Sequence, residues 1–434
     1  MTINPRSTAL DILIAYERDG VYPNLLLKKS LKDIKVDRDK RFISALVYGV
    51  IEKKLLLDFY ISHVSSVKIK KINTVVLSIL RIGLYQIVFM STPASAACNS
   101  SVQLAKTNGQ IKSAGFVNAV LRKLAQTYES ILMPKNKIEY LSVKYSVSSK
   151  ILNVIIDSLG IEKAELFLQS GYSETKKIYI AVNRIKASDD ELLKLLRFEN
   201  IIARKTDIKG LLCVDSGFDI ESTATYTNGY FHVISKPSYI CAVSVGAQSG
   251  DVIYDMCSAP GGKTFVLSYE SADNAKITAF DIYKHKTDLI KKNCSRLGLK
   301  NVLSITADST KLNRDLINTA NRVLCDVPCS GLGMIFRKPD IKYKDCNFSD
   351  LIDIQKKILE NGCMYLKRGG RLIYSTCTVN VQENNLLIRD FLENNDKIEI
   401  DKSINIYNNN YGEKLFLPNT DNMDGFYIAV LRKK

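Results

Sequence analysis

From about residue 240 onward, the sequence alternates between short apolar runs and amphipathic runs, which is the pattern of strands followed by helices. The amphipathic runs over 284–297 and 349–366 have helical spacing. This alternation predicts a doubly wound α/β sheet, mostly parallel and with helices on both faces, over residues 240–434. The strand candidates read DVIYDMCS, KITAFDI, NVLSITAD, NRVLCDVPC, GRLIYSTC and, near the end of the chain, GFYIAVLRK.

The chain before residue 240 divides into two parts of different character. Over 1–135, apolar residues recur every three or four positions, as in RFISALVYGVIEKKLLLDFYIS and GFVNAVLRKLAQTY, which predicts a helical domain. Over 136–239, the strand pattern KKIYIAVNRI and the helical pattern SDDELLKLLRFEN, with Ser188 as its cap, predict a small α/β module. We therefore expect an α/β multidomain protein with domains at 1–135, 136–239 and 240–434.

Positive charge is concentrated in the first of these domains. The whole chain has a net charge of +16, and residues 1–135 alone hold 20 Lys and Arg against 9 Asp and Glu. Such a basic domain predicts a polyanionic partner. The basic residues are spread over several helices instead of one amphipathic face, which favours a nucleic acid over a membrane surface.

Composition also bounds the compartment and the metal chemistry. No apolar run is long enough to span a membrane, and the early charges are unlike a secretory signal, so we expect a cytoplasmic protein. The ten cysteines contain no C-x-x-C spacing and the chain has only three histidines. We therefore expect reduced thiols and no metal site.

Five successive strands of the predicted sheet end in chemically functional residues. Because the carboxyl ends of parallel strands meet at one edge of a sheet, these residues are expected to share a ligand site there. One strand-end aspartate alone is often only a helix cap, but five such ends in register favour a site. In chain order they are the segment from Cys257 to Gly262, Asp281, Asp308, the segment from Asp326 to Cys329, and Thr376 with Cys377.

The first strand end, MCSAPGGKT, contains letters typical of a nucleotide phosphate loop. Cys257 stands where such a loop needs its first glycine, and Pro260 removes a backbone donor from its centre. These two residues argue against a phosphate cradle. A glycine turn followed by a strand-end aspartate suits S-adenosylmethionine, which has a ribose and an adenine but no phosphates. The turn consists of Cys257, Ser258, Ala259, Pro260, Gly261, Gly262 and Lys263.

The other polar strand ends complete this expected cofactor site. Asp281 is placed to accept hydrogen bonds from two ribose hydroxyls. Asp308 is expected to bond the adenine edge. Lys263 is expected to meet the methionine carboxylate.

Two strand-end cysteines, Cys329 and Cys377, indicate covalent catalysis. Carbon 5 of cytosine is too poor a nucleophile to take a methyl group until a thiolate has added at carbon 6. That route needs a nucleophilic Cys, a group such as a carboxyl at N3, and a base for the carbon 5 proton. None of His63, His232 or His285 lies at the strand-end loops, so a Cys–His pair is not expected. This chemistry leaves open which cysteine attacks.

Three blocks of sequence, DMCSAPGGKT, DVPCSGLGMIFRKPDIK and YSTCTVNVQENN, resemble the signature blocks of RNA cytosine-C5 methyltransferases. The helical region, with DKRFISALVYGVIEKKLLLDFYIS, LRIGLYQI and GFVNAVLRKL, resembles the NusB-like RNA-binding domain. Over essentially the whole chain the resemblance is to the Sun/RsmB-type 16S ribosomal RNA methyltransferases. It implies a class I Rossmann-like methyltransferase sheet preceded by a NusB-like domain and a small α/β linker module.

The resemblance also implies roles and a substrate. Cys377 is implied to be the attacking thiolate, Cys329 to assist product release, and Asp326 to contact the cytosine. The implied substrate is a cytosine of 16S ribosomal RNA, at position 967. A monomer is expected, and the sequence identifies no protein partner. The residues implied to line the S-adenosylmethionine site are Cys257, Ser258, Ala259, Pro260, Gly261, Gly262, Lys263, Asp281, Asp308 and Asp326.

One segment departs from the family pattern, and three other functions stay open. Family members usually carry VQD-x-AS before the first strand of the sheet, where this chain reads VISKPS, with Ile234 and Ser235 in place of Gln and Asp. The polar contacts of that segment are therefore in doubt. The alternative functions are a transfer RNA cytosine-C5 methyltransferase, a non-catalytic RNA-binding factor and an ATPase. The missing first glycine of the phosphate loop counts against the ATPase.

Overall fold

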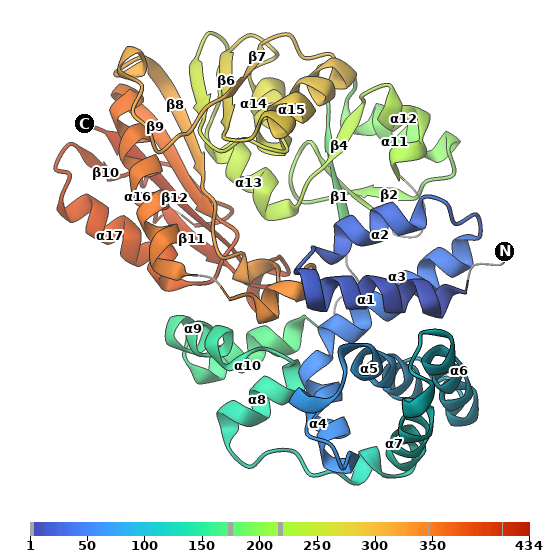
Figure 1. Ribbon diagram of the computed structural model, residues 1–434. Helices are drawn as coiled ribbons and strands as arrows, with labels where there is room; N and C mark the ends of the chain where they lie inside the picture. The colour runs from blue at the N-terminus through green and yellow to red at the C-terminus, as the bar shows by residue number, and fades with distance from the viewer. Residues whose placement is uncertain (1–3, 172–176, 216–219, 346, 410) are drawn as a thin grey trace. The chain divides into compact units, whose positions relative to one another are not determined.

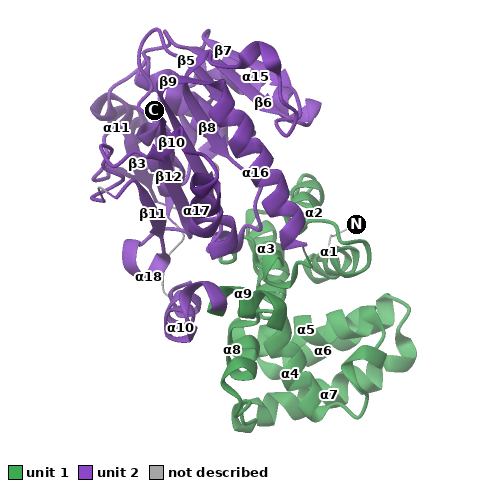
Figure 2. Cartoon of the chain, turned by 90° about the vertical axis from the view of Figure 1, so that its left-hand side faces the viewer, with its two compact units in different colours: residues 1–156, 335–345 green, residues 157–334, 346–434 purple. Residues whose placement is uncertain are grey.

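The structure is a computed structural model that describes residues 4–171, 177–215, 220–345, 347–409 and 411–434. It divides into two compact units, one formed by residues 1–156 and 335–345 and the other by 157–334 and 346–434 (Figure 2). The second unit contains a small antiparallel sheet and a large sheet (Figure 1), whereas residues 136–156 of the predicted small module lie in the first unit. The predicted domain boundaries after residues 135 and 239 remain a prediction.

The first unit is helical, as the apolar spacing predicts. Its core contains Leu46 and Leu57, both fully buried. The first helix begins with Pro5 at a position that needs no backbone donor, and the side chain of Asn4 caps it. The α-helices are α1 Pro5–Asp19, α2 Pro23–Leu31, α3 Asp37–Glu52, α4 Lys54–Val64, α5 Thr74–Phe89, α6 Ala94–Thr107, α7 Ala114–Thr127, α8 Lys137–Tyr145 and α9 Ser149–Leu159, which extends past residue 156. The short 3₁₀ helices are η1 Ile69–Lys71, η2 Ile111–Ser113, η3 Tyr128–Ser130 and η7 Pro339–Tyr343.

A short segment from late in the chain completes the helical unit. Residues 335–345 lie within this unit, although they begin only three residues after the PCSG segment of the second signature block. Tyr343 donates its hydroxyl to the carbonyl of Ile51 at 2.7 Å, and the buried Lys342 donates to the carbonyl of Tyr145 at 3.2 Å. No periodicity in the sequence predicts this placement.

The small module of the second unit is built on an antiparallel sheet of order β2-β3-β1-β4. The alternation of Ile178, Ile180 and Val182 falls on its strand β1, as predicted. Ser188 caps α11 and exchanges hydrogen bonds with Glu191, which confirms the predicted cap. The elements are α10 Ile161–Ser170, β1 Ile178–Val182, α11 Asp189–Phe198, β2 Ala203–Lys205, β3 Leu211–Val214, η4 Ile220–Ser222, α12 Ala224–Thr227 and β4 Phe231–Val233.

The large sheet has the order β10-β12-β9-β8-β5-β6-β7, with β11 paired to β12. Strands β5 to β9 pair in parallel, whereas β10, β11 and β12 pair antiparallel, so the predicted mostly parallel sheet is confirmed. The strands are β5 Val252–Asp255, β6 Lys276–Asp281, β7 Val302–Thr306, β8 Ala320–Asp326, β9 Leu366–Thr376, β10 Ile398–Ile400, β11 Glu413–Phe416 and β12 Phe426–Lys433. The helices are α13 Lys236–Ser244, α14 Gly262–Glu270, α15 Lys284–Leu297, α16 Phe348–Tyr365, α17 Asn385–Glu393 and α18 Pro418–Asp421, with 3₁₀ turns η5 Arg314–Leu316, η6 Leu332–Met334 and η8 Val381–Glu383.

The strand order decides where a ligand can bind. Strand β5 lies between β6 on one side and β8 on the other, so the chain reverses its direction of progress across the sheet at β5. Loops that leave the carboxyl ends of β5 and β8 therefore diverge, and a crevice forms between them.

The predicted helices over 284–297 and 349–366 are also found, the second displaced by one residue. Among the residues that the structure describes, no helix is long and apolar enough to cross a membrane.

Candidate active site

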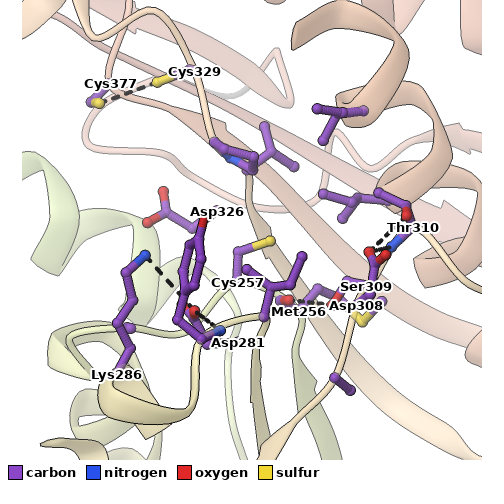
Figure 3. A pocket seen from close by; sticks show the side chains of 18 residues that line it. Met256, Cys257, Asp281, Lys286, Asp308, Ser309, Thr310, Asp326, Cys329 and Cys377 are labelled. Atoms are coloured by element: carbon purple, nitrogen blue, oxygen red, sulfur yellow. Dashed lines mark hydrogen bonds and ion pairs between the residues drawn. The ribbon is translucent and has the colours of Figure 1, made fainter. Parts of the chain in front are cut away.

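A cavity of about 550 Å³ lies at the carboxyl ends of the parallel strands (Figure 3). Its volume lies within the range typical of small-molecule sites. The Cys329–Cys377 pair lies at one end and Asp308 with Thr310 at another, with Asp326 and Asp281 also facing the space. Its lining residues are Met256, Cys257, Ala259, Asp281, Ile282, Tyr283, Lys286, Ala307, Asp308, Ser309, Thr310, Asp326, Val327, Pro328, Cys329, Ile354, Ile358 and Cys377.

The glycine turn connects β5 to α14 and separates this cavity from a smaller one of about 200 Å³. Cys257 and Ala259 line both cavities, whereas Ser258, Pro260, Gly262 and Lys263 line only the smaller one. Gly261 caps α14 with a φ of 103°, a conformation that favours glycine. A Cβ on Gly261 would lie 2.3 Å from the ring of Phe265, so a side chain is excluded there. Ser258 donates from both its backbone N–H and its hydroxyl to the carbonyl of Phe280, each at 2.8 Å. These contacts hold the turn against the neighbouring strand β6.

Lys263 and Asp326 form an ion pair across the site. The Lys263 ammonium lies 2.5 Å from Asp326 Oδ2, and Asp326 Oδ1 accepts a hydrogen bond from Ser375 Oγ at 2.7 Å. Burial, the largest single effect, disfavours the charged form of Lys263, but Asp326 together with Cys241 and Asp255 outweighs it and raises the Lys263 pKa. The sequence had assigned Lys263 to a methionine carboxylate and did not anticipate its pairing with Asp326. Ser375, which precedes the strand end, was also missed.

Asp281 and Asp308 lie on neighbouring strand ends of the cavity. Asp281 Oδ1 accepts the backbone N–H of Tyr283 at 3.1 Å and lies 3.8 Å from the ammonium of Lys286, a residue that sequence reasoning missed. Asp308 Oδ1 accepts the hydroxyl and the backbone N–H of Thr310, at 2.6 and 3.0 Å, and these bonds lower the Asp308 pKa. Both carboxylates therefore face the cavity in fixed orientations.

Two groups beside the turn hold protons tightly. Burial, followed by the neighbouring carboxylates of Asp255, Asp326 and Asp281, raises the pKa of the Cys257 thiol well above its usual value. Burial also raises the pKa of Asp255 to about 7, although Asp255 Oδ2 accepts a hydrogen bond from Thr264 at 2.7 Å. Cys257 is thus a wall of the cavity and a poor nucleophile. Asp255 is the last residue of β5, and its burial was not visible in the sequence.

The thiols of Cys329 and Cys377 meet at the end of the cavity (Figure 3). Their sulfur atoms lie 3.2 Å apart, at hydrogen-bond distance. The hydrogen bond to Cys377, and then burial, raise the pKa of Cys329 well above its usual value. The carbonyl of Cys377 also accepts the backbone N–H of Gly333 at 3.0 Å. One cysteine can therefore stay protonated and donate a hydrogen bond to a thiolate on the other cysteine.

His232 corrects one expectation, because it does contact the glycine turn. Its Nε2 lies 3.0 Å from the carbonyl of Gly262, and its Nδ1 lies 3.1 Å from the hydroxyl of Tyr269. Since a carbonyl can only accept, Nε2 carries the proton and Nδ1 accepts from Tyr269. Burial lowers the His232 pKa to about 3, so the ring is neutral. Both ring nitrogens take part in hydrogen bonds, to the Gly262 carbonyl and to the Tyr269 hydroxyl, so neither is available to pair with a thiol.

The divergent segment VISKPS connects β4 to α13. Ser235 caps α13 by accepting the backbone N–H of Ser238 at 3.3 Å. Serine and aspartate are both good caps, so the change at Ser235 preserves a capping function. Ile234 is buried close to Gly262.

Within the described residues, no cluster of three or more His, Cys, Asp and Glu is arranged to hold a metal ion.

The fold and the site together define a Rossmann-like methyltransferase domain joined to a helical NusB-type domain. A family model described as 16S rRNA methyltransferase RsmB/F matches residues 242–432, and one described as NusB family matches residues 3–126. The probable ribosomal RNA small subunit methyltransferase B of Bacillus subtilis (strain 168) is 32% identical, covering 99% of this chain and 98% of that protein. The chain belongs to the ribosomal RNA small subunit methyltransferase B family.

Further relatives agree with this assignment. Ribosomal RNA small subunit methyltransferase B of Proteus mirabilis (strain HI4320) is 28% identical, with 99% of each chain covered. The crystal structure of PH0851 superimposes with a TM-score of 0.83 at 22% identity and covers 100% of both chains. A methyltransferase homolog protein from Pyrococcus horikoshii gives a TM-score of 0.59 at 24% identity, over 70% of this chain and 100% of that one. These structural likenesses establish the fold.

Proposed function

We propose that this protein transfers a methyl group from S-adenosylmethionine to carbon 5 of a cytosine in 16S ribosomal RNA, through a covalent bond between Cys377 and carbon 6. The observation that carries the proposal is the 3.2 Å contact between Cys329 and Cys377 at the end of a cavity that also contains Asp281, Asp308 and Asp326. The named activity of the relatives supports the substrate class. The family resemblance implies that the target is the cytosine at position 967 of this RNA.

The residues of the cavity fit the proposed cofactor. When bound, S-adenosylmethionine supplies a methyl group on a positively charged sulfur. Asp281 can accept the two ribose hydroxyls, and Asp308 can bond the adenine edge. The glycine turn contributes Cys257 and Ala259 to the lining of the cavity. A structural neighbour, NSun6 from Pyrococcus horikoshii, was crystallised with SFG, an analogue of this cofactor, and its TM-score to this chain is 0.58.

The paired thiols support a division of labour between two cysteines. Attack at carbon 6 requires a thiolate, and a thiol that keeps its proton can stabilise a thiolate beside it by donating a hydrogen bond. The family resemblance implies that Cys377 is the nucleophile, and the raised pKa of Cys329 is consistent with the donor role. Asp326, whose carboxylate faces the space beside the thiols, would contact the cytosine ring (Figure 3).

Release of the product needs a base for the carbon 5 proton. After methylation, removal of that proton lets the carbon–hydrogen electron pair form the carbon 5–carbon 6 double bond. The bond between carbon 6 and sulfur breaks, and its electron pair returns to Cys377. Once Cys377 is bonded to carbon 6, no thiolate remains beside Cys329, and Cys329 can lose its own proton to solvent. The Cys329 thiolate would then accept the carbon 5 proton, because its sulfur is in contact with that of Cys377.

The basic helical domain is proposed to hold the RNA by its phosphates. The target base would have to leave its stack to reach thiols at the end of a cavity. The test is incubation of the purified protein with small-subunit ribosomal RNA, as naked RNA and as particles, with S-adenosylmethionine, followed by bisulfite sequencing. We expect one new 5-methylcytosine. A methyl group at another atom, or none in either substrate, contradicts the proposal.

The alternatives are separated by two further measurements. A transfer RNA methyltransferase would modify transfer RNA in the same assay and leave ribosomal RNA unmodified. S-adenosylhomocysteine should raise the melting temperature and ATP should not, because a ligand stabilises the folded state that binds it. Stabilisation by ATP alone would support an ATPase, and RNA binding with no effect of S-adenosylhomocysteine would support a non-catalytic RNA-binding factor.

A further inference from the structure

We propose that Glu383 is a positioning residue that holds the loop of Cys329 and the loop of Cys377 at their working distance. Glu383 lies at the end of the third signature block and has no place in the chemistry described above. It does not line the cavity. The inference rests on the proposed function for its catalytic consequence but not for its geometry.

The carboxylate of Glu383 is fully buried and accepts four hydrogen bonds. Its Oε1 accepts Ser330 Oγ at 2.5 Å and Asn380 Nδ2 at 2.9 Å. Its Oε2 accepts the backbone N–H of Ser330 at 2.8 Å and Gln355 Nε2 at 2.9 Å. All four donors are neutral groups. A carboxylate only accepts and has about four lone-pair positions, so this arrangement matches its full capacity.

These bonds connect the two loops that carry the thiols. Ser330 is the residue after Cys329, so Glu383 fixes the backbone directly beside that thiol. Asn380 lies three residues beyond Cys377 on the other loop. Ser330 Oγ also lies 2.7 Å from the hydroxyl of Thr378, the residue after Cys377. One buried carboxylate is therefore bonded to both loops within a few residues of both sulfur atoms.

Glu383 is itself held in place by its surroundings. Its backbone carbonyl accepts the hydroxyl of Tyr374 on β9 at 2.7 Å. Gln355 on α16 donates both to Glu383 and, at 2.9 Å, to the carbonyl of Pro328, the residue before Cys329. Hydrogen bonds to an ionised acceptor are roughly twice as strong as neutral ones. The carboxylate is thus the acceptor that couples a strand, a helix and the two loops.

The decisive substitution is Glu383→Gln, which keeps the size of the side chain. The glutamine amide has an NH₂ group in place of one of the two carboxylate oxygens. At that position its N–H donors face neighbouring groups that also donate, so those hydrogen bonds are lost. The matched control is Glu413→Gln. Glu413 also accepts a short hydrogen bond, from the hydroxyl of Tyr427 at 2.6 Å, but on β11.

The geometric readout is the rate at which diamide, a thiol oxidant, joins Cys329 to Cys377. Two thiols lose their hydrogens to the diamide nitrogens and a sulfur–sulfur bond forms, which mass spectrometry of the linked peptides detects. Wild type and Glu413→Gln should react at similar rates. Glu383→Gln should react roughly tenfold more slowly, because bond formation requires held proximity.

The catalytic readout is methyl transfer under steady-state, multiple-turnover conditions, which give kcat and KM separately. We expect Glu383→Gln to lower kcat by about 100-fold, the size of effect that a shift of about 1 Å produces. The KM for S-adenosylmethionine should stay within about twofold, since Glu383 does not line the cofactor cavity. If the variant does not fold, Ser330→Ala removes one of the same bonds and should show the same effects in smaller degree.

Wild-type disulfide formation and wild-type kcat in a folded Glu383→Gln variant would overturn the inference. Equal losses in Glu413→Gln would overturn it too, because the effect would then be general. A wild-type protein that forms the disulfide but transfers no methyl group would refute the proposed function instead. Slower disulfide formation in Glu383→Gln would still support the positioning role in that case.

Discussion

The sulfur atoms of Cys329 and Cys377 lie 3.2 Å apart although the two residues are 48 positions apart in the sequence. Cys329 follows β8 and Cys377 follows β9, and these strands pair in parallel. Parallel pairing places their carboxyl ends at the same edge of the sheet. The contact is therefore a direct result of strand register. It places the two thiols at hydrogen-bond distance, so the protonation of each thiol affects the other.

Substitution of each cysteine should give a different result. Cys377→Ala should abolish methyl transfer and form no covalent complex with RNA, because the nucleophile is gone. Cys329→Ala should accumulate a covalent protein–RNA complex, visible as a slow band on a denaturing gel, because the bond forms but is not released efficiently. A complex in Cys377→Ala and none in Cys329→Ala would reverse the two assignments.

Gly261→Ala should abolish cofactor binding. An added Cβ lies 2.3 Å from the ring of Phe265, and φ is 103°, so both packing and backbone resist the change. We expect a loss of about 1–3 kcal/mol in stability and no measurable heat on titration with S-adenosylhomocysteine. Gly115→Ala is the control. Its Cβ would meet nothing within 4 Å on helix α7, and it should bind the ligand normally.

The stability of the protein should depend on His232 at acid pH. Its folded-state pKa is about 3, below the ordinary value of 6.5. As the pH falls below 6.5, His232 of the unfolded chain is protonated, whereas His232 of the folded chain stays neutral until about pH 3. The stability that this histidine contributes above pH 6.5 is therefore lost progressively between pH 6.5 and pH 3. The contribution is on the order of 5 kcal/mol. Asp255, with a raised pKa, has the opposite slope.

Comparison with His232→Gln isolates this contribution. The glutamine can still donate to the Gly262 carbonyl, and Asp255 is present in both proteins. The free energy of unfolding in urea, followed by circular dichroism because the chain has no Trp, should vary less between pH 6.5 and 3 in the variant. The exposed His63→Gln should retain the wild-type profile. Identical profiles for wild type and His232→Gln would refute this account of the buried ring.

RNA affinity should fall steeply as salt rises. If the basic helical domain holds phosphates, binding releases counterions, and several contacts cost on the order of 10³ in affinity between 50 and 200 mM salt. Filter binding over that range measures the slope. The affinity for S-adenosylhomocysteine, which has no phosphates, should change little and serves as the control. A flat RNA-binding curve would exclude a phosphate-dominated interface.

Several features were predictable because they depend on local pattern. The helix Lys284–Leu297, the strand containing Ile180 and the cap at Ser188 follow from apolar period and capping chemistry within a few residues. The glycine turn was equally readable, because Cys257 and Pro260 are incompatible with a phosphate loop. The expectation that strand ends gather at one edge needed only the rule for parallel sheets.

Other features depended on packing between distant residues. The ion pair of Lys263 with Asp326 joins residues on separate strand ends, and His232 reaches the glycine turn from the small module. Neither contact has a periodicity or spacing that announces it. Glu383 reads as one more charged residue in a polar loop until its four buried donors are seen.

The sequence by itself determined the order of the elements, the chemistry available at each strand end and the resemblance that ranked Cys377 above Cys329. Only the tertiary structure decided which of these groups touch, which are buried and which segment completes which unit, as with residues 335–345. The physical reason is that hydrophobic period and capping act over a few residues. Ion pairs, buried carboxylates and thiol contacts instead arise where strand register and side-chain packing bring distant parts of the chain together.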